Sequence, residues 1–146
     1  MLEIPAPLRL RLDGDALVHN WRWLARQGGA AAGAAIKANG YGLGANGVME
    51  RLFAAGCRDF FVATWAEAAA LMPLPAGARL SVLHGVRAED MAAALTLPAV
   101  PVLNNLEQVA RWRASGQGRR CEIMVDTGMN RLGLRPEEAL AGALDG

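Results

Sequence analysis

The chain has 146 residues, of which 53% are hydrophobic and 20% are charged, a composition typical of a folded domain and not of a disordered chain. Its formal net charge of +1 excludes the strong electrostatic footprint of a protein that binds nucleic acid or a membrane surface. We therefore expect a single domain without either partner.

The N-terminal stretch MLEIPAPLRLRLDGD has an acid and two prolines where a secretory signal would have its apolar core. The longest uncharged apolar run, residues 30–36, is too short to cross a bilayer. Cys57 and Cys121 have no CxxC spacing, and His19 and His84 belong to no HExxH motif. We expect a cytoplasmic protein with free thiols and no metal site.

The first helix is predicted to begin at Asp13 or Asp15, either of which can cap it, and to run through Gln27. A second amphipathic helix is predicted from about Asn46 to Gly56, because glycine commonly ends a helix.

Later helices also have recognisable ends. Thr64 is placed to cap the segment WAEAAALM before Pro73, with Glu67 at the capping-box position. Asn104 or Asn105 is predicted to start LEQVARWRAS, which Gly116 ends, and Pro136 suits the first turn of PEEALAGAL. The densest basic group is predicted to form a solvated face, and it consists of Arg111, Arg113, Arg119 and Arg120.

Five apolar runs alternate with these helices at intervals of roughly 20 to 25 residues, the spacing of βα units. The runs are AAIKA (34–38), DFFVAT (59–64), RLSVLHG (79–85), AVPVLN (99–104) and CEIMVDTG (121–128). They are apolar at both odd and even positions, which predicts parallel strands covered on both faces. Two architectures stay open: a doubly wound sheet, or five-eighths of a (β/α)₈ barrel.

The glycine-rich loop after the first run permits one functional interpretation. Gly42, Gly44 and Gly47 spell G-x-G-x-x-G, and Glu67 follows twenty residues later, as in a dinucleotide-binding oxidoreductase. However, residues 37–41 separate the strand from the first glycine, and Glu67 falls inside a predicted helix.

Lys37, the only lysine in the chain, supports a second interpretation. Catalytic groups of parallel α/β proteins gather at the carboxyl ends of strands, where Lys37 is predicted to lie. Its apolar neighbours Ala35 and Ile36 disfavour the charged ammonium form. A lysine in that position can form a Schiff base with an aldehyde such as pyridoxal phosphate, and the alternative is a lysine that extends into solvent.

Three segments resemble signatures of the alanine racemase family, which uses pyridoxal 5'-phosphate. They are LDGDALVHNWRWL (12–24), AIKANGYGLGA (35–45) and VDTGMNRLGL (125–134). The resemblance extends from about Leu8 to Gly146. It implies an α/β fold, an incomplete (β/α)₈ TIM-type barrel with about five of eight strands.

The resemblance also implies roles for individual residues. Lys37 matches the family's Schiff-base lysine, which is also one of two catalytic acid–base groups. Tyr41 matches the tyrosine that binds the cofactor phosphate. Arg131 matches the arginine that contacts the cofactor's phenolic oxygen and the substrate carboxylate, and Leu83 is expected to line the cofactor. Met124 departs from the pattern, because many relatives have a carbamate-forming lysine there.

Residues 1–146 thus resemble the N-terminal portion of the pyridoxal-phosphate-binding barrel domain. The rest of the barrel and the C-terminal β-domain, which supplies the opposite catalytic base across a homodimer, have no counterpart here. The intact protein is expected to interconvert L-alanine and D-alanine for peptidoglycan, and the isolated chain is expected to be inactive. The rival interpretations are a related pyridoxal-phosphate decarboxylase and a non-catalytic pyridoxal-phosphate-binding barrel protein.

Overall fold

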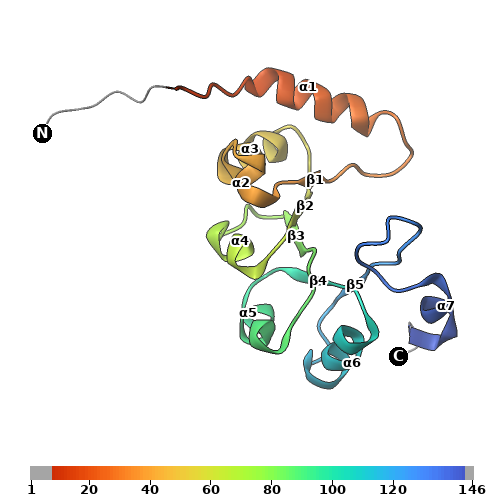
Figure 1. Cartoon of the computed structure of the whole chain (residues 1–146). Coiled ribbons are helices and arrows are strands. Elements are labelled where there is room, and N and C mark those ends of the chain that lie inside the picture. Colours follow the sequence, from red (N-terminus) through yellow and green to blue (C-terminus); the bar gives the residue numbers. More distant parts are fainter. Residues whose placement is uncertain (1–7, 144–146) are drawn as a thin grey trace, which may run out of the picture.

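Five parallel strands form a curved sheet in the computed structural model, which describes residues 8–143 (Figure 1). The strands are β1 (Ala34–Ala35), β2 (Asp59–Val62), β3 (Arg79–Val82), β4 (Val100–Leu103) and β5 (Glu122–Ile123). Each lies within one of the five predicted apolar runs. The proline-containing residues 1–7 and residues 144–146 lie outside the described part.

The helices begin where the sequence supplies caps. Asp13 Oδ1 accepts hydrogen bonds from the amides of Asp15 and Ala16, and Thr64 and Glu67 form the predicted capping box. Asn105, not Asn104, caps the later helix by accepting from the amide of Gln108. The four helices with predicted starts are α1 (Gly14–Ala25), α3 (Ala45–Ala54), α4 (Trp65–Ala70) and α6 (Leu106–Ser115).

Other helical segments are shorter. The predicted PEEALAGAL helix is one turn, α7 (Pro136–Glu138), followed by a π-helical turn, η2 (Ala139–Ala143). A 3₁₀ turn, η1 (Ala88–Asp90), and α5 (Met91–Thr96) lie between β3 and β4, where the alternating pattern implied a helix but no helix bounds were predicted. The remaining segment, α2 (Lys37–Tyr41), is described below with the site.

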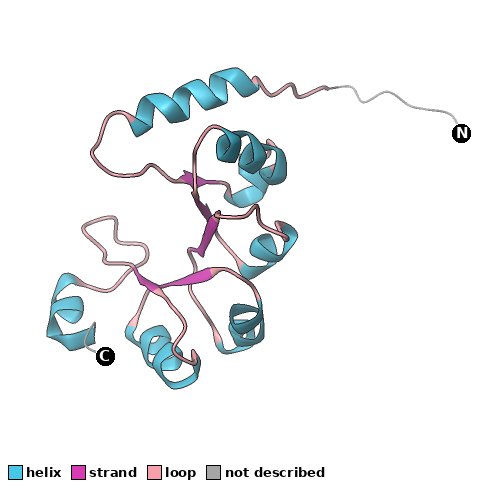
Figure 2. Ribbon diagram, turned by 180° about the vertical axis from the view of Figure 1, so that it is seen from behind, coloured by secondary structure: helices cyan, strands magenta, loops and turns pink. Residues whose placement is uncertain are grey.

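Strand order decides between the two architectures. The sheet order is β1-β2-β3-β4-β5, so every strand pairs with its neighbour in the sequence. A doubly wound sheet reverses direction at a switch point, whereas a (β/α)₈ barrel adds strands consecutively. The helices that connect these strands line the outer side of the curve (Figure 2). The chain therefore forms an incomplete (β/α)₈ barrel, as predicted.

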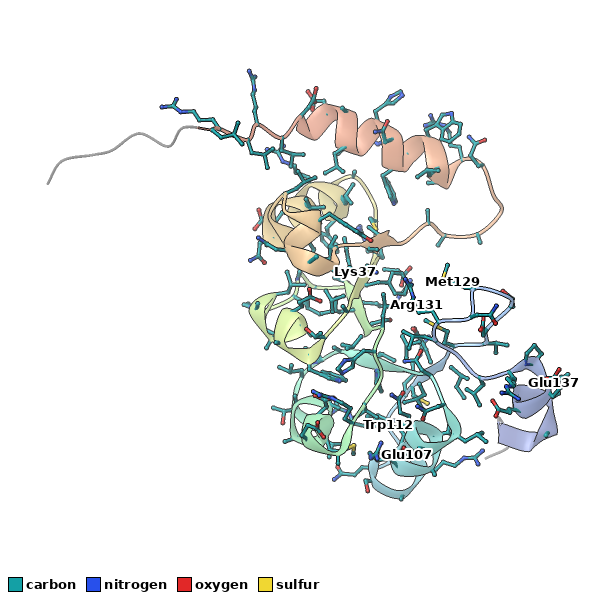
Figure 3. The ribbon with its side chains drawn as sticks, in the orientation of Figure 1. Lys37, Glu107, Trp112, Met129, Arg131 and Glu137 are labelled. Carbon is teal, nitrogen blue, oxygen red and sulfur yellow. The ribbon has the colours of Figure 1, made fainter. Side chains whose placement is uncertain are left out.

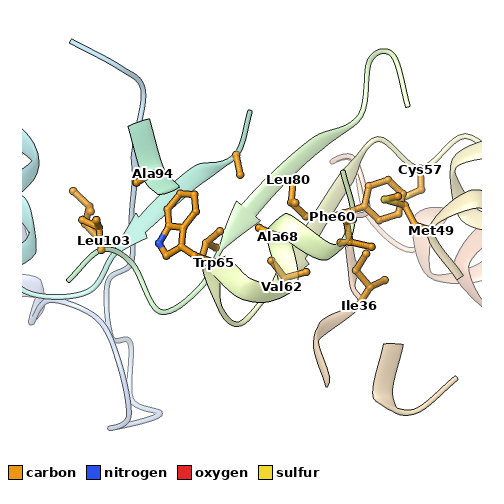
Figure 4. Close-up of a cluster of buried hydrophobic side chains, with 14 of the residues drawn as sticks. Ile36, Met49, Cys57, Phe60, Val62, Trp65, Ala68, Leu80, Ala94 and Leu103 are labelled. Carbon is orange, nitrogen blue, oxygen red and sulfur yellow. The ribbon is translucent and has the colours of Figure 1, made fainter. Parts of the chain in front are cut away.

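The hydrophobic core lies between the sheet and these helices (Figure 4). The strand residues that face the helices are at most 1% exposed, and they include Phe60, Val62, Leu80 and Val82. At alternate positions Ala35 is exposed and Phe61 is half-buried. The prediction of strands covered on both faces holds for β3 and β4, where residues 80–82 and 101–103 are buried without a break, but it is wrong for β1 and β2. The inner face of a barrel is covered by strands across the barrel, and five strands do not close it.

The basic group does not form the predicted solvated face throughout. Arg119 donates hydrogen bonds to the carbonyls of Ala94, Leu95 and Leu97 at the end of α5. Arg111 donates to the carbonyl of Val86 and to Glu107. Arg119 therefore binds the end of α5, and Arg111 binds the loop after β3. Cys57 and Cys121 are free thiols. No helix among residues 8–143 is long and apolar enough to span a membrane.

Candidate active site

A solvent-open pocket with a cavity volume of about 150 Å³ lies at the carboxyl ends of the strands. Its lining residues are Lys37, Ala63, Leu83, His84, Met124, Met129, Arg131 and Leu132. Figure 3 shows Lys37 beside the loop that carries Met129 and Arg131. Lys37 and Arg131 are about 90 residues apart in the sequence, and the structure brings them together with Leu83 in one pocket.

Lys37 starts a left-handed turn instead of ending a strand. Ala38, Asn39, Gly40 and Tyr41 have φ values of 51°, 53°, 65° and 55°. Each non-glycine residue in this conformation costs about 1–2 kcal/mol, so surrounding contacts must hold the turn. The preceding Ile36 is buried, and its amide donates to the carbonyl of Phe61 at 2.8 Å.

The side chain of Asn39 stabilises the far end of this turn. Its Oδ1 accepts a hydrogen bond from the amide of Ala45, the first residue of α3, at 3.0 Å. Asparagine also tolerates left-handed backbone better than most residues. Gly40 is buried and leaves little room for a side chain, since an added Cβ would lie 3.2 Å from the amide nitrogen of Ala45. The N-G pair in the sequence is therefore needed for this geometry.

Side-chain hydrogen bonds hold the loop after β3, which supplies Leu83 and His84 to the pocket. Asn104 Nδ2 donates to the carbonyl of Leu83 at 2.9 Å, and Gln108 Nε2 donates to that of His84 at 3.1 Å. Trp65 Nε1 donates to the carbonyl of Gly85 at 2.8 Å. Three successive carbonyls are thus fixed by side chains from two neighbouring βα units, which makes this wall rigid.

His84 is a pocket residue that the sequence interpretation did not assign to the site. Its Nε2 lies 3.0 Å from Asp90 Oδ2, and Asp90 also accepts two hydrogen bonds from the guanidinium of Arg87. These bonds from Arg87 are the main reason that the pKa of Asp90 is lowered to about 2. An ionised Asp90 holds the imidazole of His84 in a fixed orientation. The position of His84 one residue after Leu83, at a strand end, was the available signal.

Arg131 lies on a loop that is held by hydrogen bonds between residues of the loop itself. Asp126 Oδ1 accepts hydrogen bonds from the amides of Gly128 at 2.9 Å and Asn130 at 3.1 Å. These bonds lower the pKa of Asp126. The loop closes where the amide of Asp126 donates to the carbonyl of Leu134 at 2.8 Å. Arg131 itself is exposed at the pocket rim.

The structure also places three other residues that the sequence analysis discussed. Tyr41 is 63% exposed and does not line the pocket, although it shares the left-handed turn with Lys37. Met124, where the resemblance led us to expect a carbamate-forming lysine, does line it. Glu67 lies in the first turn of α4 and not at the tip of β2, so it is not placed as the acid of a dinucleotide-binding fingerprint.

Comparison with known proteins agrees with this geometry. The family model for the alanine racemase N-terminal domain matches residues 12–145. The chain belongs to this family. An alanine racemase of Rhizobium meliloti is 44% identical across 97% of the chain, and a catabolic alanine racemase of Agrobacterium fabrum is 45% identical across 88%. The matches cover 38% and 35% of those two relatives, so the chain spans little more than a third of their length.

Solved structures show the same fold. Alanine racemase from Bartonella henselae, described with covalently bound pyridoxal phosphate, has a TM-score of 0.78 and 34% identity over 89% of this chain and 38% of its own. Biosynthetic alanine racemase from Pseudomonas aeruginosa has a TM-score of 0.73 and 32% identity over 86% of this chain and 36% of its own. A histidine racemase from Leuconostoc mesenteroides has a TM-score of 0.75 and 26% identity over 90% and 37%. These similarities confirm the prediction of an incomplete barrel.

The pocket residues of this chain fit pyridoxal phosphate. Among the described lining residues, Lys37 and Arg131 are cationic and none is a carboxylate, which favours an anionic ligand. A Schiff base with the cofactor's aldehyde requires a primary amine, and Lys37 is the only lysine in the chain. An aromatic ring requires apolar walls, which Leu83, Met124 and Leu132 provide.

Proposed function

We propose that this chain provides the Lys37 side of the active site of a pyridoxal-phosphate-dependent alanine racemase. The observation that carries the proposal is that the only lysine and Arg131 line one pocket at the carboxyl ends of barrel strands. Sites of this fold are located at that end. Family membership supports alanine as the amino acid whose two enantiomers are interconverted.

The residues of the chain take separate roles in this proposal. Lys37 would hold the cofactor covalently, through its Nζ and the cofactor's aldehyde carbon. The same amine then accepts or donates the α-proton on one face of the substrate. Arg131 binds the phenolic oxygen of the cofactor and the substrate carboxylate. When bound, pyridoxal phosphate supplies an electron sink for the carbanion.

Leu83 and Tyr41 complete the proposed cofactor contacts. Leu83 packs against the ring from a wall that three side chains hold in place. Tyr41, which lies exposed on the turn that begins at Lys37, would hold the cofactor phosphate. Met124 cannot form a carbamate, so we infer that another residue or a bound anion orients Arg131.

We further propose that residues 1–146 correspond to the N-terminal portion of the barrel domain. The base for the opposite face and most phosphate ligands then belong to parts of the relatives that this chain does not span. In that arrangement the complete enzyme is a cytoplasmic homodimer that supplies D-alanine for peptidoglycan. A non-catalytic pyridoxal-phosphate-binding barrel protein is the second candidate. The same fold and the same cofactor residues would suit a protein that binds the cofactor without catalysis equally well.

Reductive trapping tests the proposal directly. The purified chain is incubated with excess pyridoxal phosphate and borohydride, and the modified peptide is located by mass spectrometry. We expect modification at Lys37 well above that at the N-terminal amine, because Lys37 lies in a pocket with Arg131 and, among the described lining residues, no carboxylate. Equal modification of both amines would contradict a built cofactor site.

Racemisation distinguishes the two candidates. A protein in which this chain is continued by the remaining barrel and β-domain is expected to convert L-alanine into D-alanine. The 146-residue chain alone is expected to be inactive, since loss of one acid–base group costs about 10²–10⁴ in rate. Cofactor binding without racemisation by the longer protein would favour the non-catalytic candidate. L-histidine is assayed in parallel, because a histidine racemase has this fold.

A further inference from the structure

The carboxylate of Glu67 contacts two segments that are distant in the sequence. Its Oε2 accepts hydrogen bonds from the amides of Ala63 at 2.7 Å and Thr64 at 3.1 Å, just after β2. Its Oε1 accepts a hydrogen bond from the amide of Ala38 at 2.7 Å, 29 positions earlier in the chain. One side chain therefore ties the residue after Lys37 to the carboxyl end of β2.

Helix capping explains only part of this arrangement. Glu67 forms a capping box with Thr64, whose Oγ1 accepts from the amide of Glu67 at 3.3 Å. The capping box requires a contact between Glu67 and the amide of Thr64. The bond to Ala38 is not part of that motif, so it has a separate consequence for the segment that contains Lys37.

That consequence follows from the left-handed backbone at Ala38. An L-residue stays in this conformation only where its surroundings hold it. Asn39 has a side chain that bonds to the amide of Ala45, but Ala38 has no side chain that could form a local bond. Its amide is instead held by Glu67, from a different βα unit.

We infer that Glu67 is a positioning residue that directs Lys37 into the pocket by fixing the amide of Ala38. The inference rests on the proposed attachment of the cofactor at Lys37. Fixing the peptide that follows Lys37 restricts where its Cα, and therefore its amine, can lie. A misplacement of about 1 Å at a reacting group can cost on the order of a hundredfold in rate.

Glu67→Gln is the test variant, because the amide is nearly isosteric with the carboxylate but keeps one acceptor oxygen. That oxygen can serve the paired amides of Ala63 and Thr64, which leaves an NH₂ group facing the amide of Ala38. Thr64→Ala is the matched control, since it weakens the same helix cap and leaves the Ala38 bond intact. Glu107→Gln controls for the lost charge, because Glu107 is exposed and pairs only locally with Arg111.

Two quantities are measured for each full chain: the rate of reductive trapping at Lys37 with saturating pyridoxal phosphate, and hydrogen exchange of the Ala38 amide. We expect Glu67→Gln to trap on the order of tenfold more slowly and to exchange at Ala38 at least tenfold faster. Both controls should keep the wild-type trapping rate, even though Thr64→Ala lowers the unfolding temperature.

The outcomes separate this inference from the proposed function. If wild type is modified at Lys37 and folded Glu67→Gln is modified equally fast, the positioning role is wrong. If the wild-type chain is not modified preferentially at Lys37, the proposed cofactor site is wrong. Hydrogen exchange of the Ala38 amide in Glu67→Gln then still tests whether Glu67 holds that amide. If Glu67→Gln does not fold, Glu67→Asp replaces it, because a carboxylate that is one methylene shorter cannot span both segments. A folded Glu67→Asp chain with wild-type trapping also overturns the inference.

Discussion

The two segments that bring charge to the pocket are built in different ways. The Lys37 turn, residues 37–41, is held by partners elsewhere in the fold, including Glu67 and the first residue of α3. The Arg131 loop, residues 125–134, is held mainly by Asp126, which bonds to amides two and four positions away. The turn is therefore coupled to the core, whereas the loop is organised locally.

Exposure alone does not separate the two segments, because Tyr41 on the turn is 63% exposed. On the loop, Met129 is 75% exposed and Leu132 is 42% exposed, whereas Leu134 at its end is buried. Apolar side chains on a loop at an open sheet edge indicate a surface that other residues cover in a complete barrel. The chain therefore holds the side of the pocket that contains Lys37 in place by itself. The side around Arg131 depends on residues that would cover the loop.

The largest expected effect is at Lys37. Lys37→Ala should abolish reductive trapping within the pocket and the visible absorption of the bound cofactor, because no other lysine exists in the chain. Lys37→Arg should fail equally, since a guanidinium stays protonated and does not add to an aldehyde. Spectral titration with pyridoxal phosphate measures both variants, and a retained absorption band in either one contradicts the assignment.

A smaller effect is expected at Arg131. Arg131→Ala should weaken binding of pyridoxal phosphate about tenfold, because a charged hydrogen-bond donor at the pocket rim is lost. The loop does not depend on this side chain for its shape, so the thermal unfolding temperature should stay within a few degrees. Arg135→Ala, an exposed arginine on the following segment, is the control. A large loss of stability with unchanged affinity would instead indicate a structural role.

Asn39 and Asn130 provide a direct comparison of the turn and the loop. Both have left-handed backbone, with φ of 53° and 55°. Asn39→Ala should lower the free energy of unfolding by about 1–2 kcal/mol, because it removes the bond to the Ala45 amide and places alanine in left-handed backbone.

Asn130→Ala should leave global unfolding unchanged, since a locally organised loop can open without the core. Urea denaturation measures both variants. Equal losses of stability would show that the Arg131 loop is as strongly coupled to the fold as the Lys37 turn.

The strands and most helix starts could be predicted because they depend on local signals. Lys37 was predicted from its place at a strand end, whereas Leu83 and Arg131 were predicted only through the family resemblance. Thr64 with Glu67 and Asp13 are caps that any helix of this type needs. The choice between a barrel and an open sheet depended on strand pairing, which apolar runs do not encode. The bond between Glu67 and Ala38 spans 29 positions and carries no local pattern, and His84 looks in sequence like any histidine after a strand.

The smallest expected effect is a local response of the Arg131 loop to acid. The folded pKa of Asp126 lies below its ordinary value of 3.8 because the amides of Gly128 and Asn130 donate to the carboxylate. A lowered pKa means that the ionised form stabilises the folded loop above the ordinary pKa, and that this contribution is lost as the pH falls through the folded pKa. The amide resonances of Gly128 and Asn130 should therefore shift with a midpoint below pH 3.8. Asp126→Asn should remove that titration while the Ala38 amide and the global unfolding temperature stay unchanged. If the Ala38 amide follows the same midpoint and loses it in Asp126→Asn, the loop and the Lys37 turn form one cooperative unit, and the division between them is wrong.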